Sequence, residues 1–303
     1  MNVSVVICTY SLDLYDDLQE AIASVLNQTY DDVEVVVVVD GNTELYRRIQ
    51  REWADDDRVH TTCNEENRGL SASRNRGIEL ANGDVIAFMD DDAVAEERWI
   101  AELVAVYEER DEVAVGGRMK GRWVAGRPAF LPQEFYWLVG VTHRGFPDEG
   151  EVRNTFGSNI SFRAGVLEAI GGFDENLGRK GDRHVQGEET ELAARLREES
   201  GRTVYYNPDA VVEHKVFEYR TKAGWLLKRA FWQGYSKRAM ETILPDSSGQ
   251  ERDFLSFLLT DSAPERAKKL IRRPSLRKLT QFVMLFVFTA AVGFGYLYGF
   301  RKW

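Results

Sequence analysis

Three apolar runs of strand length lie within the first 92 residues, and polar side chains follow each of them. The runs are 3–8, followed by Thr9 and Tyr10; 33–39, followed by Asp40; and 85–89, followed by Asp90, Asp91 and Asp92. Segments 14–26, 71–81 and 96–109 place apolar residues at helical spacing. This alternation predicts an α/β fold, a mainly parallel sheet with helices on both faces. Ligands of such sheets bind outside the carboxyl ends of the strands, so we expect the polar residues to share one site.

The triplet Asp90, Asp91 and Asp92 concentrates three carboxylates at one strand end. Two carboxylates about 4 Å apart repel by roughly 4 kcal/mol at an effective dielectric constant near 20. A divalent cation with a phosphate-bearing ligand relieves that repulsion. The triplet therefore predicts a nucleotide-sugar site, and a solvated acidic turn is the alternative interpretation.

Three further groups are candidates for chemistry. Glu188 and Glu189 begin a predicted helix at 189–199 and offer a general base, although the helix dipole alone favours acids there. Segment 67–77, with Asn67 and Arg74, suits phosphate or uracil-ribose recognition, or is a solvated basic helix end. His214 follows an apolar run and is either a structural histidine or a late metal ligand.

Composition limits the possible partners and compartments. The net charge of −10, without a basic stripe, argues against nucleic-acid binding. Cys8 and Cys63 lie in strand-like contexts without metal-ligand spacing, which favours reduced core thiols. The first residues lack a basic segment and an apolar core ahead of a cleavage site, so we do not expect secretion.

Near the C-terminus, segment 282–300 runs for 19 residues without a charge. As a helix it is about 28 Å long, close to the hydrocarbon thickness of a bilayer. Six basic residues precede it, at 268, 269, 272, 273, 277 and 278, and place the bulk of the chain on the cytoplasmic side. Arg301 and Lys302 follow it and keep a buried core helix or a re-entrant segment open as alternatives.

Six motifs occur in order along the chain. They are VSVVICTY at 3–10, VVVDG at 37–41, NRGLSASRNRG at 67–77, FMDDD at 88–92, GGFDE at 171–175 and GEETEL at 187–192. Together they resemble the family 2 glycosyltransferases of the GT-A fold, over roughly residues 1–215. The resemblance implies an inverting, single-displacement transfer that depends on a divalent cation, Mg²⁺ or Mn²⁺.

The resemblance also implies roles for individual residues. Nucleotide-sugar contacts would come from Thr9, Tyr10, Asp40, Asn67, Arg74, Asp90 and Asp91. The metal would be held by Asp92, with Asp90 and His214. Glu189 would be the base where the family commonly has Asp, and this difference leaves Glu188 as the alternative.

The C-terminal segments FEYRT at 217–221, FWQGYSKR at 231–238 and FVFTAAVGFGY at 286–296 resemble haloarchaeal glycosyltransferases that act on dolichyl-phosphate-linked lipids, especially the glucuronosyltransferase type. The resemblance implies transfer from a UDP-sugar, with glucuronic acid as the expected sugar, to a dolichol-linked acceptor in N-glycan assembly. It places the enzyme at the cell membrane with the catalytic domain facing the cytoplasm. Acceptor-proximal residues would be Asn159, Asp174, Arg229, Lys237 and Arg238.

We expect three parts: a catalytic domain at 1–215, basic amphipathic helices at 216–278 and a membrane segment at 279–303. Three alternatives for the function stay open. The enzyme could charge dolichyl phosphate with its first sugar, or the chain could be an inactive nucleotide-sugar-binding scaffold at the membrane. A nucleotidyltransferase would share a similar sheet but would release pyrophosphate.

Overall fold

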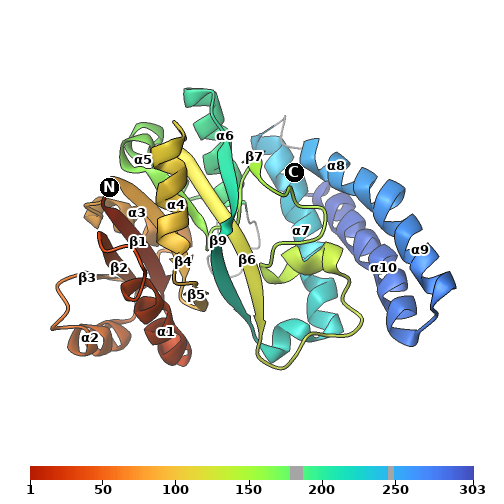
Figure 1. The fold of residues 1–303 in the computed structure, drawn as a ribbon, viewed down its shortest axis with the longest axis horizontal. Coiled ribbons are helices and arrows are strands. Elements are labelled where there is room, and N and C mark those ends of the chain that lie inside the picture. Colours follow the sequence, from red (N-terminus) through yellow and green to blue (C-terminus); the bar gives the residue numbers. More distant parts are fainter. Residues whose placement is uncertain (178–186, 245–248) are drawn as a thin grey trace. The chain divides into compact units, whose positions relative to one another are not determined.

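The computed structural model describes residues 1–177, 187–244 and 249–303 (Figure 1). The chain divides into two compact units. The first unit contains residues 1–120, 147–177 and 188–215. The second contains 121–146 and the described residues from 216 onward.

The first unit is built on a sheet with helices packed against it. Its strands are β1 Val3–Thr9, β2 Val33–Asp40, β3 Val59–Asn64, β4 Val85–Asp90, β5 Ala93–Ala95, β6 Ala114–Trp123, β7 Gly150–Val152, β8 Ile160–Arg163 and β9 Val204–Val216. Its helices are α1 Tyr15–Leu26, α2 Thr43–Glu52, α3 Leu70–Leu80, α4 Trp99–Glu109, α5 Ala164–Ile170 and α6 Glu188–Ser200, with a 3₁₀ turn at Leu12–Leu14.

The sheet has the order β3-β2-β1-β4-β8-β6-β9-β5, and β7 pairs with β9. Strands β3, β2, β1 and β4 are parallel, whereas β8 joins β4 and β6 in antiparallel pairs and β9 does the same with β5 and β7. The predicted α/β fold is present, but the prediction of a mainly parallel sheet is wrong for this second half. Strand β6 begins with four buried residues, two of which are glycines, and alternates in exposure only afterwards, so it shows no long apolar run.

The parallel strands end at one edge of the sheet. In the register, Thr9 of β1 lies beside Val39, Cys8 lies beside Asp90, and Asp40 lies beside Asn64. Because the strands are parallel and their registers align their ends, the polar residues after each apolar run lie together at this edge. The shared edge that the sequence predicts is therefore present.

Helices cover both faces of the parallel half, because side chains alternate along each strand. Val5 and Ile7 of β1 belong to a buried cluster with α1, α2 and α4. Val6, between them, meets the opposite face at α3, where a Cβ added at Gly77 would overlap it. This contact packs the C-terminal half of α3 against the sheet.

Helix α2 and strand β3 were not among the elements expected from the sequence. Helix α2 is short and rich in charge, yet Leu45 and Ile49 are fully buried, and each contributes about 1.5–3 kcal/mol relative to exposure. The side chain of Asn42 caps the helix by accepting a hydrogen bond from the Leu45 amide at 3.0 Å. Two apolar positions and one cap gave too weak a periodic signal.

The second unit is mostly helical. Its elements are 3₁₀ segments Gln133–Val139 and Glu218–Thr221, α7 Ala223–Ile243, α8 Gly249–Phe257, a π-helical turn Leu258–Ser262, α9 Ala263–Arg272 and α10 Leu276–Gly299. Helices α7 and α10 pack backbone to backbone, because a Cβ added at Gly234 or Gly295 would overlap the carbonyl oxygen of Val292 or Phe231. The predicted apolar segment is thus a helix with one face against α7.

Helix α10 is long and apolar enough to cross a membrane, by length and composition, and 22% of its apolar window is buried among the described residues. Leu285 and Phe288 on one face belong to the core of the unit. Phe294 and Leu297 on another face are exposed. The helix therefore combines a packed face, as expected of a core helix, with an apolar face open to its surroundings.

Candidate active site

The structure brings Asp90, Asp92 and His214 together at the polar edge. One potential ligand atom from each lies within 4.8 Å of the others. The sheet register explains the approach of residues so distant in sequence: β5 directly follows the triplet and pairs with β9, which sets Ala93 opposite His214. Asp92 Oδ1 and His214 Nε2 are 3.3 Å apart, and both side chains are buried.

The chemistry of these donors fits a divalent cation. Carboxylate oxygens suit Mg²⁺ and Mn²⁺, and imidazole nitrogen is a common ligand of transition metals. The charge of the triplet points the same way. Burial raises the pKa of Asp91 to about 7, and the carboxylates of Asp92 and Asp90 add to the rise. Burial and repulsion between the neighbouring carboxylates both disfavour the ionised form of Asp91, and a cation at this position would favour it.

Arg74, on α3, connects this cluster to the start of α6. Its buried guanidinium donates to Glu189 Oε1 at 3.2 Å and lies 3.8 Å from Glu188 Oε1 and 3.6 Å from Asp90 Oδ1. It also donates to the Gly157 carbonyl at 3.2 Å. Burial alone would lower the pKa of Arg74, but the three carboxylates raise it, so the guanidinium stays charged.

Glu188 and Glu189 occupy the first turn of α6, as predicted, but their environments differ. The side chain of Glu189 is 19% exposed and that of Glu188 is 6% exposed. Burial raises the pKa of Glu189 to about 7, with a further contribution from the Glu188 carboxylate and an opposing one from Arg74. Glu189 is thus the more accessible carboxylate, and its pKa lies where a general base works well near neutral pH.

Gly157 and Ser158 also belong to this site, although the sequence did not single them out. A Cβ added at Gly157 would overlap Glu189 Oε1 and lie 2.6 Å from Arg74 Nη2. Ser158 Oγ accepts a hydrogen bond from the Asp90 amide at 2.9 Å. The only signal was a run of small residues before β8, in a segment whose periodicity is weak.

We expect Gly157→Ala to lower the turnover number at least tenfold with little change in folding stability. The added methyl group displaces the ends of the Glu189 and Arg74 side chains, and small displacements of groups in an active site are costly. Gly165→Ala is the matched control, because a Cβ there meets nothing within 4 Å. Steady-state kinetics and urea denaturation of both variants provide the measurement. Wild-type turnover in Gly157→Ala would show that the backbone contact is dispensable.

The predicted nucleoside-binding residues line the same edge with different exposure. Thr9 is buried, Tyr10 is 61% exposed and Asn67 is exposed. Asp40 is buried and accepts hydrogen bonds from the amides of Arg68 and Gly69, each at 2.8 Å, and from the Asn64 side chain at 2.9 Å. Asp40 therefore holds the segment that leads into α3.

The predicted acceptor-proximal residues belong to both units: Asn159 and Asp174 to the first, and Arg229, Lys237 and Arg238 to the second. Asn159 is fully buried; its amide nitrogen donates to the Arg118 and Ala210 carbonyls, and its Oδ1 accepts from Trp99 Nε1. Those contacts favour a structural role. Asp174 accepts from the Asn176 amide within its own turn.

Arg229, Lys237 and Arg238 lie on α7 of the second unit. Lys237 pairs with Glu251 at 2.8 Å, and Arg238 pairs with Glu241 at 3.3 Å. Contact of these residues with an acceptor stays a prediction.

Comparison with known proteins adds relatives along the whole chain. The model of the family described as "Glycosyl transferase family 2" matches residues 4–171. The chain is 52% identical over 301 residues to "Glucosyl-dolichyl phosphate glucuronosyltransferase" of Haloferax volcanii, covering 99% of this chain and 96% of that protein. It is 27% identical over 185 residues to "Glycosyltransferase AglE" of the same organism, covering 60% of this chain and 59% of that protein.

Two solved structures share the fold. The mannosyltransferase PcManGT from Pyrobaculum calidifontis, in complex with GDP-Man and Mn²⁺, has a TM-score of 0.62 at 18% identity and covers 100% of this chain and 88% of its own. Residues 1–349 of S. aureus TarS, in complex with UDP-GlcNAc, give a TM-score of 0.57 at 18% identity, covering 96% and 82%. The α/β sheet with its polar edge is thus a GT-A fold, the six sequence motifs are confirmed as a family resemblance, and the chain belongs to glycosyltransferase family 2.

Proposed function

We propose that the protein transfers glucuronic acid from UDP-glucuronic acid to glucosyl-dolichyl phosphate at the membrane, as a step in N-glycan assembly. The observation that carries the proposal is the 52% identity, over nearly the full length of both chains, to the Haloferax volcanii protein with that activity in its name. The match covers 99% of this chain and 96% of that protein.

In the proposed reaction, an acceptor hydroxyl attacks the anomeric carbon of the donor sugar in a single displacement. The new bond joins the acceptor oxygen to that carbon, and the bond from the same carbon to the UDP oxygen breaks. Glu189 takes the proton of the hydroxyl, and UDP leaves from the opposite side, so the anomeric configuration inverts. The greater exposure of Glu189 and its pKa near 7 support Glu189 over Glu188 as the base.

On the donor side, Asp90, Asp92 and His214 would hold Mg²⁺ or Mn²⁺. When bound, such a cation stabilises the negative charge that develops on the leaving diphosphate. Thr9, Tyr10, Asn67 and Asp91 lie at the same edge and would contact the nucleotide. Asp40 would act there through the segment that its carboxylate holds.

Arg74 is proposed as a positioning residue. Its side chain is 4% exposed and contacts Asp90 and Glu189, so little of the guanidinium is accessible to a nucleoside. A guanidinium fixed in this way can keep the carboxylates of Asp90, a proposed metal ligand, and Glu189, the proposed base, at a constant distance from each other. It also offsets part of the repulsion among the three carboxylates around it.

We further propose that residues 1–215 form the catalytic domain, with basic helices over 216–278 and a membrane segment over 279–303. The six basic residues ahead of the apolar segment support a cytoplasmic catalytic domain by the positive-inside rule. The apolar face of α10, with Phe294 and Leu297 exposed, supports contact with lipid.

A donor and acceptor screen on the full chain in detergent tests this function. UDP-glucuronic acid, UDP-glucose and UDP-N-acetylglucosamine are each offered with glucosyl-dolichyl phosphate or dolichyl phosphate, and UDP release and lipid product are measured. We expect product from UDP-glucuronic acid and glucosyl-dolichyl phosphate. Efficient transfer to bare dolichyl phosphate would instead identify an enzyme that charges the lipid with its first sugar.

The pH dependence should report the base. The pKa of Glu189 is raised to about 7, so its carboxylate is protonated below that pH and cannot accept a proton. We expect kcat/KM to rise with pH through an acid limb near pH 7 and to fall about tenfold for each pH unit below it. A profile measured from pH 5 to 9 at constant ionic strength decides this, and a flat profile down to pH 5 would contradict it.

A further inference from the structure

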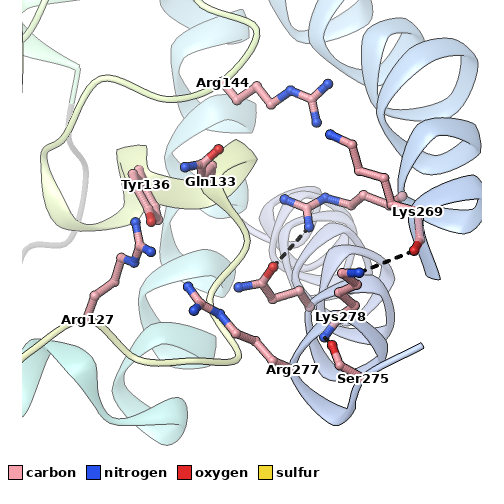
Figure 2. A pocket seen from close by; sticks show the side chains of 10 residues that line it. Arg127, Gln133, Tyr136, Arg144, Lys269, Ser275, Arg277 and Lys278 are labelled. Carbon is pink, nitrogen blue, oxygen red and sulfur yellow. Dashed lines mark hydrogen bonds between the residues drawn. The ribbon is translucent and has the colours of Figure 1, made fainter. Parts of the chain in front are cut away.

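The second unit contains a basic cavity of about 360 Å³, within the size range of about 300–1,000 Å³ for ligand pockets. Its lining residues come from the segment around the first 3₁₀ helix of the unit, from α9 and from the first turns of α10 (Figure 2). Six of them are cationic: Arg127, Arg144, Arg266, Lys269, Arg277 and Lys278. Among the described residues, none of those that line this cavity is acidic.

Two nearby carboxylates offset part of this charge. Glu134 is fully buried and pairs with Arg266 and Arg144, while Glu265 pairs with Arg144 and Lys269. Burial would raise the pKa of Glu134, but hydrogen bonds from Arg266 and Ser262 lower it. This carboxylate is therefore ionised, and these partners already occupy it. The positive charge of the six cations therefore exceeds the negative charge of the two carboxylates.

Three of the six cations have no such partner. Within the described residues, no carboxylate lies at ion-pair distance from Arg127, Arg277 or Lys278. The ammonium group of Lys278 instead donates to the Arg273 carbonyl at 2.5 Å. In Figure 2 the side chain of Arg277 lies between Arg127, which is next to Tyr136, and Lys278, which is next to Ser275. An anion there would meet guanidinium groups that can donate two parallel hydrogen bonds.

The position of the cavity suggests the source of the anion. Ser275 caps α10, Arg277 and Lys278 lie in its first turn, and Gln281 lies in the next turn. The apolar stretch of α10 begins directly afterwards, at Phe282. In a helix that enters a bilayer, this level corresponds to the lipid headgroups, and basic pockets at such a level bind phosphate-bearing headgroups.

We propose that this cavity binds the phosphate group of a membrane lipid where α10 enters the bilayer. The proposal depends on the membrane association of α10, but it does not depend on which sugar is transferred. It also differs from the acceptor contacts considered above on α7, because Arg229, Lys237 and Arg238 do not line the cavity.

Lipid binding to the full chain in a nonionic detergent tests the proposal, with native mass spectrometry counting bound lipid. The probes are phosphatidic acid, a polyprenyl phosphate, phosphatidylcholine and inorganic phosphate. The double variant Arg127→Gln/Arg277→Gln removes two unpaired cations from the cavity. The double variant Arg272→Gln/Arg273→Gln is the matched control, because it removes two neighbouring exposed charges that do not line the cavity.

We expect the cavity variant to weaken phosphatidic acid and polyprenyl phosphate binding by at least about tenfold, since two charge-assisted hydrogen bonds are lost. The control should change binding less than about threefold. Equal binding of both phosphate lipids supports a general headgroup site, and a preference for polyprenyl phosphate supports capture of a lipid of the acceptor class.

Equal weakening by both double variants would overturn the proposal in favour of unspecific attraction. Inorganic phosphate that binds as tightly as the lipids would overturn the lipid assignment. If Arg127→Gln disturbs folding, Arg277→Gln alone against Arg273→Gln repeats the comparison. UDP binding, which depends on the first unit, is measured in each variant, so a failure of the active-site proposal is recognised separately.

Discussion

Glu189→Gln is expected to lower the turnover number by about 10²–10⁴-fold, the usual contribution of a general base, while UDP binding stays within about twofold. Glutamine keeps the shape of the side chain and can still accept the hydrogen bond from Arg74, which is now at 3.2 Å. It cannot accept the acceptor proton. Single-turnover kinetics with saturating donor and acceptor, together with calorimetric titration of UDP, give the two values.

Glu188→Gln is the matched control for this prediction. Glu188 shares the first turn of α6, but its side chain is less exposed and lies farther from the Arg74 guanidinium. We expect it to reduce turnover less than tenfold. If Glu188→Gln abolished turnover and Glu189→Gln did not, the base would be the residue one position earlier.

The polar edge of the sheet could be predicted because its cause is local. An apolar run of five to seven residues followed by polar residues shows both where a parallel strand ends and which side chains it presents. Asp90, Asp92 and Asp40 were found in this way. His214 required one more step, because its approach to Asp92 depends on the antiparallel register of β5 and β9.

The connections between distant segments could not be predicted from periodicity. Arg74 was expected to contact the nucleotide because it lies in a segment with two glycines around a helix start. The sequence did not indicate its hydrogen bond to Glu189, which is 115 residues away. Gly157 matters only because Glu189 and Arg74 occupy the space that a side chain would fill. Steric contacts of this kind, between segments far apart in the chain, cannot be predicted from a single sequence.

The C-terminal helix shows the same limit. Its length and lack of charge predicted a membrane segment. The partner is α7, and the contact depends on Gly234 and Gly295 together. Composition predicts the helix, whereas the pairing of two small residues about 60 positions apart appears only in the fold.

The second large effect concerns the cluster at the triplet. We expect Asp92→Asn to weaken Mn²⁺ affinity by at least about 100-fold and to reduce transfer in proportion. Loss of residues that only support metal ligands already costs about 10–100-fold, and Asp92 would be a ligand itself. Isothermal titration with Mn²⁺ in the presence of UDP, and transfer assays over a range of Mn²⁺ concentrations, measure both quantities.

Folding stability separates this effect from simple damage to the protein. Asp92 raises the pKa of the neighbouring Asp91 through charge repulsion, so removal of the Asp92 charge reduces this repulsion in the metal-free protein. Asparagine can still hydrogen-bond to His214, which lies 3.3 Å from the present carboxylate. The free energy of unfolding in EDTA should therefore stay the same or rise.

Asp209→Asn, which changes an exposed aspartate outside the cluster, controls for the loss of one negative charge and should leave Mn²⁺ affinity unchanged. Mn²⁺ affinity in Asp92→Asn within threefold of the wild type would show that the cation binds elsewhere.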